Sequence, residues 1–169
     1  PDRLVIIMGS AAGTVKETVD YLNSIGAHVG MLVVRLFRPL DVEAFIKAIP
    51  KSVVSIAVLD RCKEPTGIGE PLYMNVVNAL NEAQENHHAH VIGGRYGLSS
   101  KEFTPAMAKA VFKELKKNQP KNHFTIGIDD DVNHTIDFLP WGSSTKGGRD
   151  NWRYWFRHIY RRTGQIYYK

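Results

Sequence analysis

The fold is decided by the unit LVIIMGSAAGTVKETVDYLNSIG (residues 4–26) near the start of the chain. Its first five residues are all apolar, which predicts a buried strand over 4–8, and Gly9-Ser10 predicts a tight loop after it. From Thr14 onward, apolar residues recur at helical spacing until Gly26, a residue type that commonly ends helices. The unit therefore predicts a strand, a loop and a helix in that order.

The same alternation of strand and helix continues through most of the chain. Strands that are apolar on both faces and separated by helices are typical of a parallel sheet, and right-handed crossovers would place the helices on both of its faces. We therefore expect an α/β fold, an open doubly wound parallel sheet of about five strands, followed by a basic aromatic C-terminal tail. Further strands are expected at 28–34, 53–59, 90–92 and 124–128, and further helices at 41–49, 71–84 and 104–115.

A glycine-rich block, GGRYGLSSKEFTP (residues 93–105), is the most distinctive motif of the chain. Three glycines within five residues, around Arg95 and Tyr96, predict a rigid turn. Arginine and tyrosine are frequent anchors of protein interfaces, so we expect Arg95 and Tyr96 to dock on another domain. The next helix is expected to have Pro105 just inside it and to start at one of three capping residues, Ser99, Ser100 or Thr104.

A second candidate region is the charged loop over 60–69 with the following Glu70. Arg61 can hold a carboxylate or phosphate of a ligand or partner, or it can form a local Arg–Glu pair that orders the loop. Cys62 is the chain's only cysteine, which excludes an internal disulfide, a four-cysteine iron–sulfur cluster and a four-thiolate zinc site. We expect an inert, reduced thiol; the alternative is a reactive thiol whose pKa is lowered by Arg61 and Lys63.

Other candidate sites are weaker. Ligands of doubly wound sheets bind at the carboxyl ends of the strands, which directs attention to four loops: 9–13, 35–39, 60–69 and 93–100. The loop 9–13 can hold a phosphate by its backbone N–H groups, but it matches neither glycine-rich phosphate motif, and a structural turn is favoured. We expect no metal site, because two groups of possible ligands lack the spacing that a metal needs: His87, His88 and His90, and Asp129, Asp130 and Asp131.

Charge is distributed unevenly along the chain. The net charge of the 169 residues is +5, but residues 141–169 contain seven basic residues and one acid, so the remainder is close to neutral. All three tryptophans also lie in that last segment. Basic residues interleaved with aromatic ones can bind nucleic acid or an anionic membrane surface, or the segment can form a helix that packs its aromatic side on the body. No apolar run approaches the length of a membrane helix, and the chain starts without a methionine, so we expect a piece of a longer or processed cytoplasmic protein.

Several motifs together resemble the pyruvate:ferredoxin (or flavodoxin) oxidoreductase family, specifically its core domain II. The resemblance covers residues 1–136, whereas residues 137–169 depart from the family, so we expect two regions with a boundary between them. The motifs are VIIMGS (5–10), VGMLVVRLFRP (29–39), IAVLDR (56–61), KEP (63–65), GEPLY (69–73), the block 93–105 and NHFTIGIDDDVNHT (122–135).

The resemblance implies a large, multidomain, homodimeric enzyme of anaerobic metabolism. Such an enzyme decarboxylates pyruvate oxidatively with thiamine diphosphate, coenzyme A and 4Fe-4S clusters, and passes the electrons to ferredoxin or flavodoxin. The matching domain resembles the carboxy-terminal domain of transketolase, and its role in the family is largely scaffolding. No catalytic, cofactor-binding or metal-binding residue of the family maps onto this stretch, so the resemblance implies no active site on the chain itself.

We therefore expect a truncated core domain that cannot turn over pyruvate alone, located in the cytoplasm or in a hydrogenosome-like organelle. The residues expected to contact neighbouring domains, a second subunit or coenzyme A are Arg61, Glu64, Arg95 and Tyr96. The alternative is a stand-alone binding module whose tail engages nucleic acid or anionic lipid. A third interpretation places the domain in a flavoprotein of sulfite reduction, where a similar domain also occurs.

Overall fold

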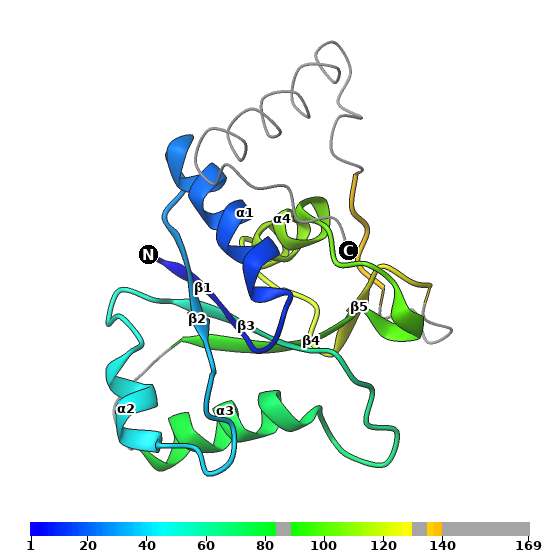
Figure 1. The fold of residues 1–169 in the computed structure, drawn as a ribbon. Coiled ribbons are helices and arrows are strands. Elements are labelled where there is room, and N and C mark those ends of the chain that lie inside the picture. Colours follow the sequence, from blue (N-terminus) through cyan, green and yellow to red (C-terminus); the bar gives the residue numbers. More distant parts are fainter. Residues whose placement is uncertain (84–88, 130–134, 140–169) are drawn as a thin grey trace.

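The structure is a computed structural model that describes residues 1–83, 89–129 and 135–139. The predicted basic aromatic tail and the residues His87, His88, Asp130 and Asp131 lie outside this part of the chain. Strands and helices alternate from the start (Figure 1). The strands are β1 (Arg3–Ile7), β2 (Val29–Val33), β3 (Ser55–Asp60), β4 (His90–Tyr96) and β5 (Phe124–Ile126); the helices are α1 (Ala12–Ser24), α2 (Val42–Lys47), α3 (Pro71–Glu82), the 3₁₀ turn η1 (Leu98–Ser100) and α4 (Pro105–Glu114).

The described strands form one parallel sheet in the order β2-β1-β3-β4-β5. The chain starts at β1, the second strand in this order. It adds β2 on one side of β1 and then β3, β4 and β5 successively on the other side. This confirms the predicted α/β class and the open, five-stranded parallel sheet. Because all strands point the same way, the loops after β1, β2, β3 and β4 meet at one edge, the carboxyl edge of the sheet.

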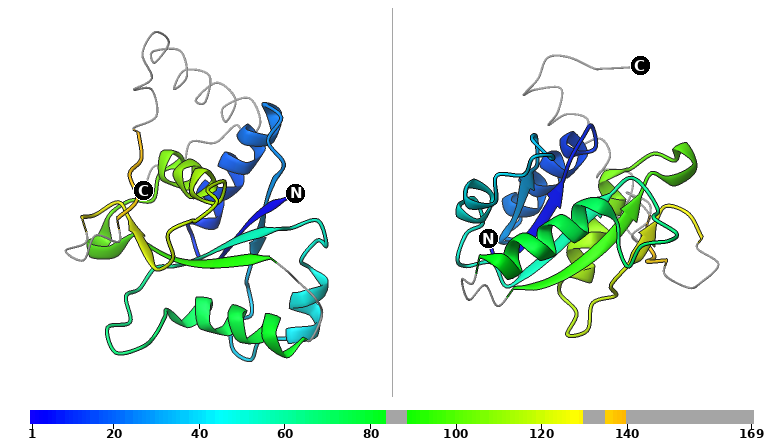
Figure 2. Two further views of the ribbon diagram at one scale, coloured as in Figure 1. Left: turned by 180° about the vertical axis from the view of Figure 1, so that it is seen from behind. Right: turned by 90° about the horizontal axis from the view of Figure 1, so that it is seen from below.

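Two apolar cores lie on the two faces of the sheet, as the pattern of the strands predicts. Val5 and Ile7 of β1 face α1 and α4, whereas Leu4 and Ile6 face α2 and α3. Figures 1 and 2 show the same two layers, with α1 and α4 over one face and α2 and α3 over the other. None of the described helices is long and apolar enough to cross a membrane.

The connection through α4 has the opposite hand to the other three. From β1 to β2 the chain moves toward one side of the sheet, and α1 covers the face that it shares with α4. From β2 to β3 and from β3 to β4 the chain moves toward the opposite side, and α2 and α3 cover the opposite face. Because both the direction and the face are reversed, these three connections have the same hand. From β4 to β5 the chain moves in the same direction as from β3 to β4, yet α4 packs beside α1 and not beside α3. The expectation of uniformly right-handed crossovers is therefore wrong for α4. The chain changes face just after Gly97, Ser99 and Ser100, which all have positive φ.

The pair Gly93-Gly94 belongs to β4 and is not part of a turn, so the prediction for this part of the block is wrong. A Cβ at Gly94 would lie 2.1 Å from Cζ of Phe124, and a Cβ at Gly93 would lie 3.0 Å from the ring of Tyr73. Phe124 belongs to the core on the α4 face, whereas Tyr73 packs against the core on the α3 face. The two glycines therefore let one aromatic ring lie directly on each side of the strand.

The start of α4 agrees with the prediction. Thr104 is the capping residue, and its hydroxyl accepts a hydrogen bond from the backbone N–H of Met107 at 3.4 Å. Pro105 occupies the first turn, where its missing N–H costs no hydrogen bond. Past β5, Ile136 is buried and Phe138 packs against the core shared with α4.

Candidate functional site

The carboxyl edge of the sheet collects the candidate residues. β3 ends at Asp60, β4 ends at Tyr96, and the two strands pair in parallel with Asp60 opposite Arg95. The loop 61–69 leads from β3 to α3, and Gly97 begins the loop from β4 to α4. Of the four residues expected to make contacts, the structure brings Arg61, Arg95 and Tyr96 to the ends of these two neighbouring strands.

Asp60 holds the start of α3. Its Oδ1 and Oδ2 accept hydrogen bonds from the backbone N–H groups of Leu72 and Tyr73, each at 3.0 Å, although the residue is only 1% exposed. Burial raises the pKa of Asp60 above its ordinary 3.8, and the two N–H groups partly offset that rise. The charge of nearby Glu70 adds to it. Asp60 therefore acts as a capping residue for a helix that begins eleven positions further along the chain.

Glu70 and Arg95 form a buried ion pair between the residue that precedes α3 and strand β4. Nε of Arg95 donates to Oε1 of Glu70, and the two side chains are 11% and 1% exposed. A local Arg–Glu pair was one of the two alternatives for the charged loop, but it forms between Arg95 and Glu70, not between Arg61 and Glu64. Oε2 of Glu70 is buried and has no hydrogen bond within the described residues. Arg95 thus directs its charge inward, and its contact with another domain stays a prediction.

Tyr96 is also turned inward, since it is only 3% exposed. Its hydroxyl donates to the carbonyl oxygen of Met8 at 3.3 Å, and its ring packs against that of Phe103 with 4.8 Å between the centroids. Burial raises the pKa of Tyr96, and the charge of Arg61 partly opposes that rise. Tyr96 therefore ties the end of β4 to the loop that follows β1.

Arg61 and Glu64 are exposed, unlike Arg95 and Tyr96. Nε of Arg61 lies 3.0 Å from the position that a Cβ of Gly97 would occupy, so the side chain rests on that glycine. Glu64 accepts a hydrogen bond from the hydroxyl of Thr66 at 2.8 Å. These two side chains are the members of the predicted set that remain available to a partner.

Cys62 is an exposed free thiol. Partial burial of the sulfur and the negative charges of Asp60 and Glu70 raise the pKa of Cys62 above its ordinary 9.0. The raised pKa favours the predicted inert thiol over the alternative of a thiol activated by its basic neighbours. The thiol stays protonated, and so weakly nucleophilic, at neutral pH.

Three residues that hold this region together were missed by the sequence reasoning. Asp60 and Glu70 were treated only as ends of a charged loop, although an acid directly after a buried strand and an acid just before a proline are both positions from which a helix can be capped. Asn122 gave no signal. Its Oδ1 accepts from the N–H of Gly93 at 2.7 Å, and its Nδ2 donates to the hydroxyl of Tyr73 at 3.2 Å.

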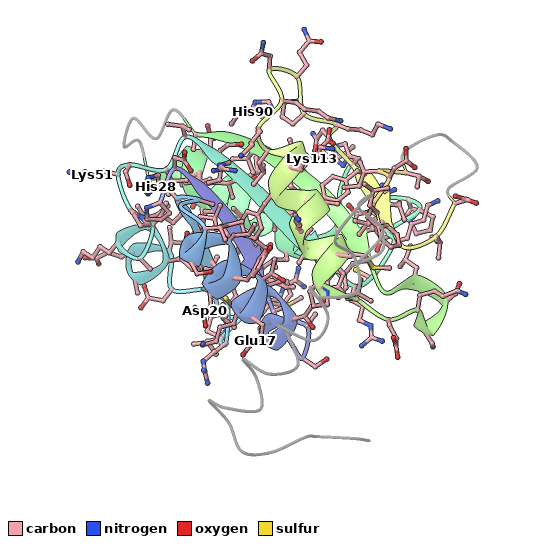
Figure 3. All side chains as sticks on the ribbon, turned by 90° about the horizontal axis from the view of Figure 1, so that it is seen from above. Glu17, Asp20, His28, Lys51, His90 and Lys113 are labelled. Atoms are coloured by element: carbon pink, nitrogen blue, oxygen red, sulfur yellow. The ribbon has the colours of Figure 1, made fainter. Side chains whose placement is uncertain are left out.

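No group of three or more histidine, cysteine or acidic residues is placed to hold a metal ion in the described part of the chain. His90 begins β4, and Figure 3 shows it with His28 at the amino edge of the sheet. His28 precedes β2, which is separated from β4 by two strands, so these two imidazoles cannot share an ion.

Comparison with known proteins identifies relatives that are much longer. The family model described as pyruvate:ferredoxin oxidoreductase core domain II matches residues 1–105. The chain is 61% identical over 145 residues to pyruvate-flavodoxin oxidoreductase of Nostoc sp. (strain PCC 7120), an alignment that covers 79% of the chain and 12% of that protein. It is 54% identical over 134 residues to pyruvate:ferredoxin oxidoreductase of Moorella thermoacetica, covering 79% of the chain and 11% of the relative.

A further relative is the mitochondrial pyruvate dehydrogenase [NADP(+)] of Euglena gracilis, 46% identical over 150 residues, with 84% of the chain and 8% of the relative covered. The chain thus spans about one eighth or less of the length of these three relatives. Since the family model matches more than half of the chain, the chain belongs to the pyruvate:ferredoxin oxidoreductase family and contains its core domain II.

Proposed function

We propose that this chain is the core domain II of a pyruvate oxidoreductase that passes electrons to flavodoxin or ferredoxin, and that it serves there as a scaffold between other domains. The observation that carries the proposal is the match of core domain II to a chain that spans only 12% of a pyruvate-flavodoxin oxidoreductase. Pyruvate oxidation to acetyl-coenzyme A is then the activity of the whole enzyme, in the cytoplasm or in an organelle of anaerobic metabolism.

The cofactors of that reaction are assigned to other domains. A 4Fe-4S cluster needs four thiolate ligands, and Cys62 is the only cysteine here. We likewise assign thiamine diphosphate to the remainder of the enzyme. When bound there, these groups supply the carbanion chemistry and the electron transfer.

The polar groups at the carboxyl edge support a scaffolding role. Asp60 caps α3, Glu70 pairs with Arg95, and all three side chains are largely withdrawn from solvent. Buried polar groups that are committed to internal bonds rigidify a domain, whereas a catalytic acid or base has to reach a substrate. The exposed Arg61 and Glu64 are the side chains of this edge that we assign to contacts with neighbouring domains or coenzyme A.

A chimaera tests the proposal. Residues 1–138 of this chain replace the matching segment of the Nostoc relative, and pyruvate-dependent reduction of flavodoxin is measured with the isolated 169-residue chain as a control. We expect an active chimaera and an inactive isolated chain. A chimaera that is folded and dimeric but does not oxidise pyruvate contradicts the assignment. Salt-sensitive binding of the isolated chain to nucleic acid or anionic vesicles would instead favour the stand-alone module.

The contact role of Arg61 is tested in the same chimaera. Arg61→Glu reverses a charge on the carboxyl edge, and Lys116→Glu, an exposed lysine after α4, is the matched control. We expect only Arg61→Glu to lower the thermal stability of the assembled chimaera or its activity. Equal behaviour of the two variants would remove Arg61 from the domain contacts.

A further inference from the structure

The side chain of Arg61 packs against Gly97, where an added Cβ would lie closer to it than ordinary contact distance. Gly97 has φ +63, a conformation that side chains disfavour, and a Cβ there would meet Nε, Cγ and Cδ of Arg61 at 3.0, 3.3 and 3.4 Å. The arginine side chain is therefore laid flat over the end of β4. Within the described residues it forms no ion pair or hydrogen bond, so the donors of its guanidinium are left available. An arginine with unused donors is suited to recognise an anion.

The turn that follows Gly97 is strained and carries hydroxyl groups. The backbone N–H of Lys101 donates to the carbonyl oxygen of Leu98 at 3.1 Å, and the two residues between them, Ser99 and Ser100, have φ of 54° and 59°. Turns with this left-handed geometry normally take asparagine or glycine. Glycine would meet the demand of the backbone without strain, so the path of the chain does not itself require serine. Strained residues of this kind cluster at ligand clamps.

The side chains of this turn lack partners inside the chain. Ser99, Ser100 and Lys101 are exposed, and their side chains form no hydrogen bond or ion pair within the part of the chain that the structure describes. Two cations and two hydroxyls thus lie on the loops that follow β3 and β4, at the edge where sheets of this kind bind ligands. Arginine, lysine and serine donors together match the oxygen atoms of a phosphate group.

We propose that Arg61, Lys101 and the turn Ser99–Ser100 form a subsite for the phosphate group of a small anionic ligand. The inference rests on the proposed contact role of Arg61 and specifies the chemistry of what it contacts. Three acids of the same edge are bonded elsewhere: Asp60 to the start of α3, Glu70 to Arg95 and Glu64 to Thr66.

The test is a titration of the isotopically labelled 169-residue chain with inorganic phosphate and with pyrophosphate, followed by backbone NMR. We expect saturable shifts confined to residue 61 and residues 97–101, and at least about tenfold weaker binding in Arg61→Gln. Arg38→Gln is the control, since Arg38 is an exposed arginine of the same edge that lies over the ring of Phe37. Scattered, unsaturated shifts, or equal loss in the two variants, would overturn the proposal.

A second variant separates binding from folding. Ser99→Gly relieves the left-handed strain, so we expect Tm to rise by a few degrees while phosphate binding weakens several-fold. Unchanged binding in that variant would exclude the turn from the subsite. If a polyglutamate peptide produces these shifts and phosphate does not, the edge docks an acidic protein surface and the proposal is wrong. An active chimaera combined with no phosphate binding would refute the subsite and leave the family role intact.

Discussion

Gly94→Ala is the substitution for which the structure makes the sharpest prediction. The added Cβ would lie 2.1 Å from Cζ of Phe124 and 2.5 and 2.6 Å from its two Cε atoms, all well inside ordinary contact distance. Phe124 is fully buried on β5, so its ring cannot swing into solvent. Relief requires either a ring displaced by more than an ångström or separation of β4 from β5, the two strands that pair Gly94 with Phe124.

The magnitude follows from the size of that overlap. Overpacking of a core costs about 1–3 kcal/mol, and an overlap this deep belongs at the upper end. Alanine recovers about 0.5–1 kcal/mol of the backbone entropy that glycine loses in a strand, so the net loss is about 2–2.5 kcal/mol. For a domain of this size that corresponds to a fall in Tm of roughly 5–10 °C.

The assay is thermal and urea unfolding of the 169-residue chain, with Gly13→Ala as the matched control. Gly13 lies in α1 with no atom within 4 Å of an added Cβ, so alanine there should leave stability unchanged or raise it by up to about 1 kcal/mol. Phe124→Leu removes the far end of the ring, and Gly94→Ala should cost less in that background. An unchanged Tm for Gly94→Ala, or additive effects in the double variant, would refute the packing argument.

Three further predictions concern the carboxyl edge. Arg95→Leu leaves the buried carboxylate of Glu70 without its partner and should cost about 3 kcal/mol or more in urea unfolding, whereas Glu70→Leu combined with Arg95→Leu should recover much of that loss; equal losses would deny the pairing. Because burial raises the pKa of Asp60, the folded chain binds its proton more tightly than the unfolded chain. The stability that Asp60 contributes is therefore complete below pH 3.8 and declines as the pH rises through the folded pKa, and Asp60→Asn should abolish that decline in melts recorded against pH. Cys62 should react with iodoacetamide at pH 7 no faster than a free cysteine, and its rate should still be rising with pH at pH 9, since its pKa is raised above 9.0; rapid labelling at pH 7 would contradict this.

Most of the fold could be predicted because its signals are local. The apolar run of β1, the helical spacing of α1 and the Thr104–Pro105 start of α4 are each contained within a few residues of sequence. The two-sided pattern of β1, with Val5 and Ile7 on one face and Leu4 and Ile6 on the other, also implies helices on both faces. These local patterns were sufficient to predict the α/β class and the parallel sheet.

The errors arose where tertiary packing decides the local structure. The composition of Gly93-Gly94 predicts a turn, yet the pair lies in β4. Glycines stand at these strand positions because the rings of Tyr73 and Phe124, which are distant in the sequence, occupy the space of a side chain. The hand of the α4 connection depends on which face the helix occupies, and no local pattern records that choice. The residues with positive φ after Tyr96 mark a change of face only when the strand order and the two cores are known as well.

The candidate site divides in the same way. The position of Arg61 and Glu64 on an exposed loop followed from composition, whereas Arg95 and Tyr96 were expected at a surface and instead point into the domain. Arg95 is drawn inward by Glu70, twenty-five positions away in the chain. Such a pairing between distant residues cannot be inferred from one sequence.

The intact mass of the native polypeptide that carries this sequence tests the central claim most directly. A denaturing immunoblot of cell extract, with an antibody raised against residues 93–101, and peptide mapping of the detected band would give that mass. A domain of a pyruvate oxidoreductase predicts a single polypeptide many times heavier than the 19.1 kDa of this chain, with peptides from the regions of the relatives that lie outside the match. A band at 19.1 kDa with no further peptides would contradict that assignment and identify a stand-alone protein.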